Sequence, residues 1–220
     1  MKKLIIILTL ILGANIVSAQ RLHLESGVSV NNFEYKNSNG VRLQNLKAVS
    51  GSYLGFGYSQ ELFTEKLLLK LDFNYSTYGS IGSDPDYGNF IEWDLSYAGI
   101  AIGFDLVALT FKKIELKAKG GASAARLIRG YQIINNVVTG LNGNEDFKGT
   151  LITPFVGLGL SYPVMDNLDF YIQFISGKSM DILDSREILK IESNTLSFGV
   201  MINLSRERRE KHVGITNEQK

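Results

Sequence analysis

Few residues in this sequence are equipped for catalysis. The chain has two histidines, His23 and His212, and no cysteine, so neither a thiolate nucleophile nor a thiolate metal site can form. Nucleophilic chemistry would need a serine beside a general base, and no G-x-S-x-G stretch is present. His23 is predicted near one mouth of the fold and His212 in a polar tail. We therefore expect no catalytic residue and no enzyme activity.

A metal site is the second chemical candidate. Asp84 and Asp86 lie in the segment GSDPDYGN (82–89), and their carboxylates could contact a divalent cation. Proline and glycine in the same segment predict a turn-rich surface loop, which accounts for its composition without a ligand. We therefore expect no metal site and no cofactor.

Charged residues recur at every second position of otherwise apolar segments. In residues 67–79 the odd positions from Leu67 to Tyr75 are apolar, whereas Lys70 and Asp72 occupy even positions. Strict alternation predicts a β-strand with one apolar and one polar face. Nine charged residues are predicted to share the polar side of such strands, inside a barrel: Glu25, Lys70, Asp72, Glu92, Asp94, Glu115, Lys117, Lys119 and Asp169.

Two interpretations of these inward charges remain open. They could form a network of ion pairs that fills a narrow interior, since buried charges persist when they are paired. They could instead line an ion path or a proton-linked site. We favour the network, because an eight-stranded barrel leaves little room for a pore. Lys70 and Asp72 are expected to pair with Glu92 and Asp94 on a neighbouring strand.

Eight segments show the period of two that positions these residues. In the fourth, the apolar set Trp93, Leu95 and Tyr97 changes parity to the set that begins at Ile100, which predicts a β-bulge near Ala98–Gly99. The approximate ranges of the eight predicted strands are 22–32, 49–60, 67–79, 91–106, 114–127, 151–162, 168–175 and 196–204.

The connections between these strands alternate in length. Long polar connections contain NSNG (37–40), GSDPDYGN, GLNGNEDF (140–147) and residues 177–191, whereas ELFTEK, VALTFKK and PVMDN are short. Long loops on one side and short turns on the other are typical of outer-membrane barrels. The pattern predicts an eight-stranded antiparallel transmembrane up-and-down β-barrel, and the even number of strands places both chain termini in the periplasm.

The apolar face could fill the core of a soluble sandwich or barrel, or it could contact lipid. Glycine and serine are frequent on the opposite face, as at Gly55 and Gly57, which suits a crowded interior. Aromatic residues near both strand ends suit two membrane interfaces. Both observations favour lipid outside. The predicted interface aromatics are Phe56, Tyr58, Tyr75, Trp93, Tyr162 and Phe170.

The N-terminal residues predict export. Lys2 and Lys3 precede an apolar run from Leu4 to Leu12, and the small residues Val17 and Ala19 suit cleavage after Ala19. Lys2 and Lys3 leave with this segment, so the 23 basic residues become 21 against 22 acidic ones. A nearly neutral chain argues against nucleic acid as a partner. The predicted parts are a signal peptide (1–19), a barrel (20–204) and a polar tail (205–220).

The order of these features resembles a known family. An export signal, a strand bearing GFG (55–57), a short turn, the segment 67–79 and a closing strand TLSFGVMINL (195–204) are similar to small porin-family outer-membrane β-barrel proteins. These are OmpA-type eight-stranded barrels that include the PorT-like proteins. The resemblance implies an outer-membrane location and, for PorT-like members, assistance to protein secretion. Such barrels commonly end at an aromatic residue, whereas this last strand ends at Leu204 before a polar tail.

Three functions follow as hypotheses. The first is a non-enzymatic structural or interaction role, with outer-membrane lipid around the barrel and a periplasmic protein partner at the tail. The second is a small-solute channel. The third and least favoured is an outer-membrane enzyme, which a change at His23 would test.

Overall fold

The computed structural model describes residues 20–36, 40–43, 45–83, 88–143, 149–180 and 188–204. The predicted signal peptide (1–19), the tail (205–220), Asp84 and Asp86 lie outside the described residues. No helix in the described ranges is long and apolar enough to span a bilayer.

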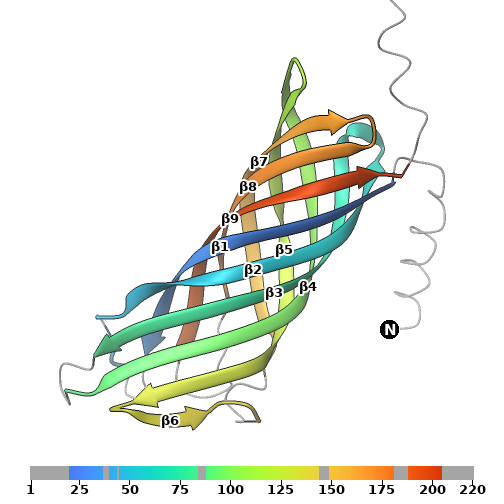
Figure 1. Ribbon diagram of the computed structural model, residues 1–220. Coiled ribbons are helices and arrows are strands. Elements are labelled where there is room, and N and C mark those ends of the chain that lie inside the picture. The colour runs from blue at the N-terminus through green and yellow to red at the C-terminus, as the bar shows by residue number, and fades with distance from the viewer. Residues whose placement is uncertain are drawn as a thin grey trace, which may run out of the picture.

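The described chain forms one antiparallel sheet that closes on itself (Figure 1). Each long strand pairs with its sequence neighbours, and the pairing of β1 with β9 closes the ring. The predicted eight-stranded antiparallel up-and-down barrel is confirmed, with one short additional strand, β6. The strands are β1 (Gln20–Lys36), β2 (Lys47–Leu62), β3 (Thr64–Ser83), β4 (Phe90–Phe111), β5 (Ile114–Ile134), β6 (Val137–Gly140), β7 (Leu151–Met165), β8 (Leu168–Lys178) and β9 (Ile188–Asn203).

The outside of the barrel is apolar all the way around. Every long strand places an exposed apolar side chain there: Leu24, Phe56, Phe73, Ile102, Ile128, Leu158, Ile172 and Phe198. The exposed fraction reaches 66% at Val156, and most of the others are about half exposed. A barrel surrounded by water would bury such a belt, because contiguous apolar patches of this extent are rare on soluble proteins. The odd-numbered residues of β3, such as Leu71 and Phe73, therefore face lipid, whereas Leu68 is buried on the inward side with Lys70 and Asp72.

The two rims of the barrel differ. One, the short-turn rim, consists of the tight turns at Phe63, Lys112–Lys113 and Asp166–Asn167. The opposite, long-loop rim extends beyond the apolar belt, since β4 has 22 residues and a tilted strand crosses a bilayer in roughly 9–11. On its outward side, β4 is apolar from Ile100 to Leu106 and polar at Ser96 and Asp94.

β6 corrects the prediction of one long polar connection after residue 127. β5 continues to Ile134, and a two-residue turn at Asn135 and Asn136 leads back into β6. Both asparagines have positive φ, at 47° and 68°, which is the backbone that a type I′ hairpin turn requires. Asparagine tolerates this conformation better than most residues, so the pair Asn-Asn between apolar pairs is the signal for this hairpin.

The predicted bulge at Ala98–Gly99 is wrong. β4 pairs with β3 without a register shift from Leu67 opposite Leu106 to Ser83 opposite Phe90. Trp93, Leu95 and Tyr97 therefore stay on the inward side of β4. Their apolar character reflects an apolar core inside the long-loop end of the barrel, and not contact with lipid.

Candidate functional site

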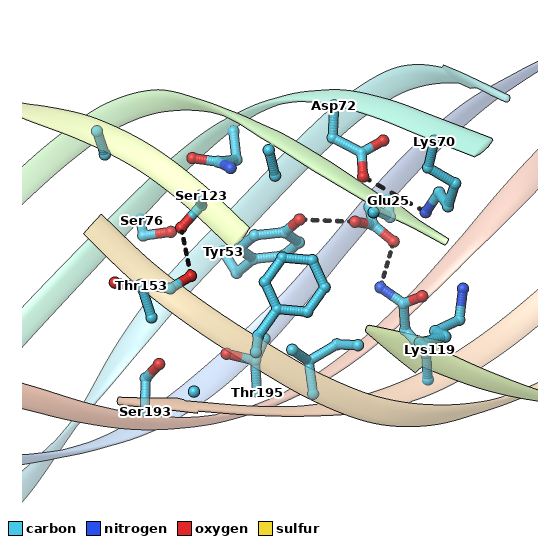
Figure 2. Close-up of a pocket in the computed structure, with 18 of the residues that line it drawn as sticks. Glu25, Tyr53, Lys70, Asp72, Ser76, Lys119, Ser123, Thr153, Ser193 and Thr195 are labelled. Atoms are coloured by element: carbon cyan, nitrogen blue, oxygen red, sulfur yellow. Dashed lines mark hydrogen bonds and ion pairs between the residues drawn. The ribbon is translucent and has the colours of Figure 1, made fainter. Parts of the chain in front are cut away.

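The interior of the barrel contains a charged layer in the half nearer the short-turn rim. Glu25 on β1 is 3% exposed, and its carboxylate accepts three hydrogen bonds. The donors are the hydroxyls of Tyr53 (2.7 Å) and Tyr171 (2.8 Å) and Nε2 of Gln173 (2.7 Å). Because Tyr53 is on β2 and the other two donors are on β8, this one carboxylate links the strands that lie on either side of β1 and β9 (Figure 2).

Ion pairs surround Glu25. Lys70 Nζ lies 3.5 Å from Asp72 Oδ2, and the other oxygen of Asp72 is hydrogen-bonded to His23 Nε2. Lys119 pairs with Asp105 on the adjacent strand β4. We call the six residues His23, Glu25, Lys70, Asp72, Asp105 and Lys119 the charged layer. Three carboxylates and two ammonium groups nearly balance, which permits charges to persist away from water.

Smaller polar pairs close the short-turn rim. Lys117 Nζ lies 3.1 Å from Glu115 Oε2, and Arg21 pairs with Glu61 at 3.0 Å. Asn203 Nδ2 donates to Asp169 at 3.2 Å. Paired polar side chains therefore extend from the charged layer to the short-turn rim.

An apolar plug fills the opposite half of the interior. Trp93 is 3% exposed, and its ring lies 6.0 Å from that of Phe33 and 5.6 Å from that of Tyr35. Leu141, which follows β6, packs into the same cluster. The plug comprises Phe33, Leu43, Trp93, Leu95, Tyr97, Ala125, Leu141, Leu151, Leu189 and Ile191.

A cavity of about 90 Å³, lined by both polar and apolar side chains, separates the plug from the charged layer. Figure 2 shows Ser76, Ser123 and Thr153 on one side of it, with Lys70 and Asp72 toward the other. Because one water needs roughly 10–15 Å³ measured this way, the cavity has room for several waters. In the described part of the chain, no group of three or more histidine and carboxylate side chains could hold a metal ion.

The structure places most of the predicted inward charges inside. Glu25, Lys70, Asp72, Lys117 and Asp169 are buried. The side chain of Lys119 is 6% exposed and that of Glu115 is 38% exposed.

Glu92 and Asp94 were predicted inside, and this is wrong. Asp94 is exposed, and Glu92 shares its side of β4, because Trp93 between them points inward. The expected pairing of Lys70 and Asp72 with these two acids is therefore wrong as well. Lys70 and Asp72 pair with each other instead.

Among the predicted interface aromatics, Phe56, Tyr162 and Phe170 are exposed on the outside. Tyr58 and Tyr75 are half-buried on the same face, and the Tyr75 hydroxyl lies 3.3 Å from Ser96 Oγ. Trp93 is the exception, since it lies in the plug. A membrane-interface role for the other five stays a prediction.

Asp105 is the member of the charged layer with a carboxylate that the prediction omits, and the rim pair Arg21 and Glu61 was omitted as well. The neighbours of Asp105, Phe104 and Leu106, are exposed, so alternation alone places Asp105 inside. Its partner Lys119 was predicted to be inside, and unpaired buried cations are costly, so this second signal also pointed to a missing acid.

Replacing Lys70 with methionine is expected to lower the free energy of unfolding by roughly 1–3 kcal/mol, because Asp72 then loses one of its two polar partners. Urea unfolding in detergent micelles would measure this. The variant should leave bilayer conductance as it is in the wild type. A clear conductance change would contradict the assignment of Lys70 to a space-filling network.

The closed ring, the encircling apolar belt and the occupied interior define the class of this molecule as a transmembrane β-barrel. No protein-family model matches the chain, and no curated protein matches it.

Solved structures similar to this chain include Neisserial surface protein A (NspA), at 15% identity over 82% of this chain and 96% of that chain, with a TM-score of 0.48. Ail of Yersinia pestis, in complex with the heparin analogue sucrose octasulfate, is 14% identical over 84% and 100%, with a TM-score of 0.43. The outer membrane protease OmpT of Escherichia coli is 8% identical over 84% and 96%, with a TM-score of 0.49. Likenesses at this level carry no argument about what this chain does.

Proposed function

We propose that this chain is an exported outer-membrane protein whose sealed barrel acts as a non-enzymatic scaffold with a structural or interaction role. The observation that carries the proposal is that side chains fill the interior at two levels. The apolar plug lies at the long-loop end, and the charged layer lies toward the short-turn rim. Side chains that fill a barrel stabilise it and leave its rims as the surfaces available to partners.

The long-loop rim supports the interaction role. The β5–β6 hairpin extends there, and its residues Val137 and Val138 are exposed apolar side chains. In Figure 1, β6 lies at the lower end of the barrel, beside the ends of β4 and β5. We assign this rim to the cell exterior, because long loops are external and short turns periplasmic in such barrels.

The finer proposal is a PorT-like contribution to protein secretion, which rests on the sequence resemblance alone. The tail (205–220) would then contact a periplasmic protein. Pull-down from solubilised membranes with the full chain, and with a chain that ends at Leu204, tests this. Partners recovered equally with both chains would contradict the role of the tail.

A small-solute channel is the second candidate, and the cavity between the plug and the charged layer is the observation that favours it. The apolar plug and the charged layer, which close the interior on either side of this cavity, argue against it. We expect the wild type to show no conductance steps in planar bilayers. We expect Trp93→Ala to remain silent as well, although losing this buried ring should lower the free energy of unfolding by about 3–5 kcal/mol.

Val138→Ala is the control for this experiment, because Val138 is exposed and outside the plug. Wild-type steps that grow in Trp93→Ala would establish the channel and refute the sealed scaffold.

A substrate cannot reach the His23 side chain, which argues against catalysis at this residue. The side chain of His23 has 0% exposure, and its Nε2 is bonded to Asp72. A general base must come within hydrogen-bond reach of the proton that it takes from the substrate. A measurable lipid- or peptide-hydrolase activity that His23→Ala abolishes would overturn the non-enzymatic proposal.

A further inference from the structure

We propose that Arg126 and Arg129, on the outside of β5, form a binding site for the phosphate group of a membrane lipid at the long-loop rim. The inference rests on the membrane location proposed above. It adds a ligand site on the lipid-facing surface, separate from the interior.

A β-bulge places both arginines on the outside. Arg129 lies opposite Ser96 on β4, and Leu127 lies opposite the next residue, Tyr97, so Ile128 is the extra residue. Residues three apart in a regular strand point to opposite faces. The extra residue reverses the alternation, and as a result Arg126 and Arg129 are both exposed on the outer face.

The bulge is held by a side chain from the loop that follows β6. Asn142 Nδ2 donates to the carbonyl oxygen of Ile128 at 2.9 Å, and its Oδ1 accepts from the Gly130 amide at 2.8 Å. The Leu141 amide donates to the Gly130 carbonyl at 2.8 Å. Leu141 belongs to the apolar plug, so the backbone on both sides of Arg129 is fixed to the barrel interior.

The two arginines lie at the edge of the apolar belt, which is where lipid headgroups are expected. Across the strand pair, Arg126 lies beside Ala98 and Arg129 beside Ser96. The next outward residue of β4 toward the membrane is Ile100, which is half exposed within the apolar belt. The guanidinium groups therefore lie where apolar surface gives way to polar surface.

In the part of the chain that the structure describes, no carboxylate forms an ion pair with either guanidinium group. Asp94 and Glu92 are acids on the same face, and they lie opposite Tyr131 and Ile133, farther from the membrane than both arginines. Arg129 lies over the Tyr131 ring, 5.1 Å from its centroid, which holds its side chain near the barrel wall. The planar fork of arginine binds phosphate oxygens in pairs.

The neighbouring apolar surface selects a lipid over a free anion. Ile128, between the arginines in sequence, and Ile100, on their membrane side, are both about half exposed. A lipid would contact the arginines with its phosphate and these isoleucines with its acyl chains. A soluble phosphate would leave the isoleucines uncovered.

The test compares three full-length proteins in detergent micelles: the wild type, R126Q/R129Q, and K112Q/K113Q, which removes the same charge from the short-turn rim. Native mass spectrometry would count retained molecules of dioleoyl phosphatidic acid, and of dioleoylglycerol, which has the same chains without phosphate. Heat-modifiable gel mobility would verify that each protein is folded.

We expect R126Q/R129Q to retain at least about tenfold less phosphatidic acid than the wild type, since each charge-assisted hydrogen bond contributes enough for such a factor. K112Q/K113Q should retain as much as the wild type, and dioleoylglycerol should not distinguish the three proteins. Equal phosphatidic acid retention by R126Q/R129Q, or an equal loss in K112Q/K113Q, would overturn the site.

Inorganic phosphate distinguishes the source of the anion. Millimolar phosphate should leave most of the phosphatidic acid bound, and complete displacement would show a site for free anions. Membrane fractionation tests the proposed location independently. A barrel that fractionates with membranes but fails the lipid comparison would refute this inference alone.

Discussion

Replacing Glu25 with alanine is expected to destabilise the barrel by roughly 3–5 kcal/mol, which is the range for removing one partner from a buried charged network. Two tyrosine hydroxyls and the Gln173 amide would lose their acceptor at once. Lys70 and Lys119 would also lose a nearby negative charge, in an interior that water reaches poorly. The measurement is reversible urea unfolding in detergent micelles, with heat-modifiable gel mobility as the readout.

Glu192→Ala is the matched control, because Glu192 is an exposed glutamate on the outside of β9. Its stability should lie within about 0.5 kcal/mol of the wild type. Glu25→Gln should fall between the two, since the amide keeps one oxygen acceptor but loses the charge. If Glu25→Ala were as stable as Glu192→Ala, the three hydrogen bonds would have no part in holding the barrel.

The second large effect is expected at Gly57, which lies on β2 opposite His23 of β1 and Asp72 of β3. A Cβ at this position would collide with Asp72 and come within 2.8 Å of His23 Nε2. It would also meet the backbone oxygen of Leu71, which cannot rotate away. Gly57→Val should therefore cost about 3 kcal/mol or more, at the upper end of overpacking.

Gly140→Val provides the comparison, because a Cβ at Gly140 meets nothing within 4 Å. We expect Gly57→Val to give little folded barrel by heat-modifiable mobility after refolding into detergent, and Gly140→Val to refold like the wild type. Equal refolding of the two variants would show that the His23–Asp72 contact tolerates expansion and is not closely packed.

Alternation predicts the interior well where a strand lies within the membrane. In β1 and β3, apolar residues contact lipid and polar residues point inward, so a period of two identifies Glu25, Lys70 and Asp72 without any structure. The same rule places Asp105 inside, because it lies between the exposed residues Phe104 and Leu106. Within the membrane, the outward face of a strand contacts lipid and is apolar, and the inward face lines a narrow polar interior.

That rule fails at the long-loop end of β4. On the long-loop side of the apolar belt, the interior of the barrel excludes water, whereas the outside contacts it. Apolar residues therefore point inward there, and polar residues point outward. Trp93 and Asp94 follow this reversed pattern on a strand whose register with β3 is unbroken. Hydropathy alone cannot mark where the membrane ends along a strand, because an apolar residue is equally favourable against lipid or in a core.

The sequence by itself determined the barrel, its number of long strands, its lipid-facing side and most of its interior charges, because these depend on local period and loop length. Only the tertiary structure decided how the charges pair, since partners such as Asp72 and His23 come from strands far apart in the chain. The apolar plug and the bulge at Ile128 were decided in the same way. Both depend on Leu141 and Asn142, which the β5–β6 hairpin brings back to β5.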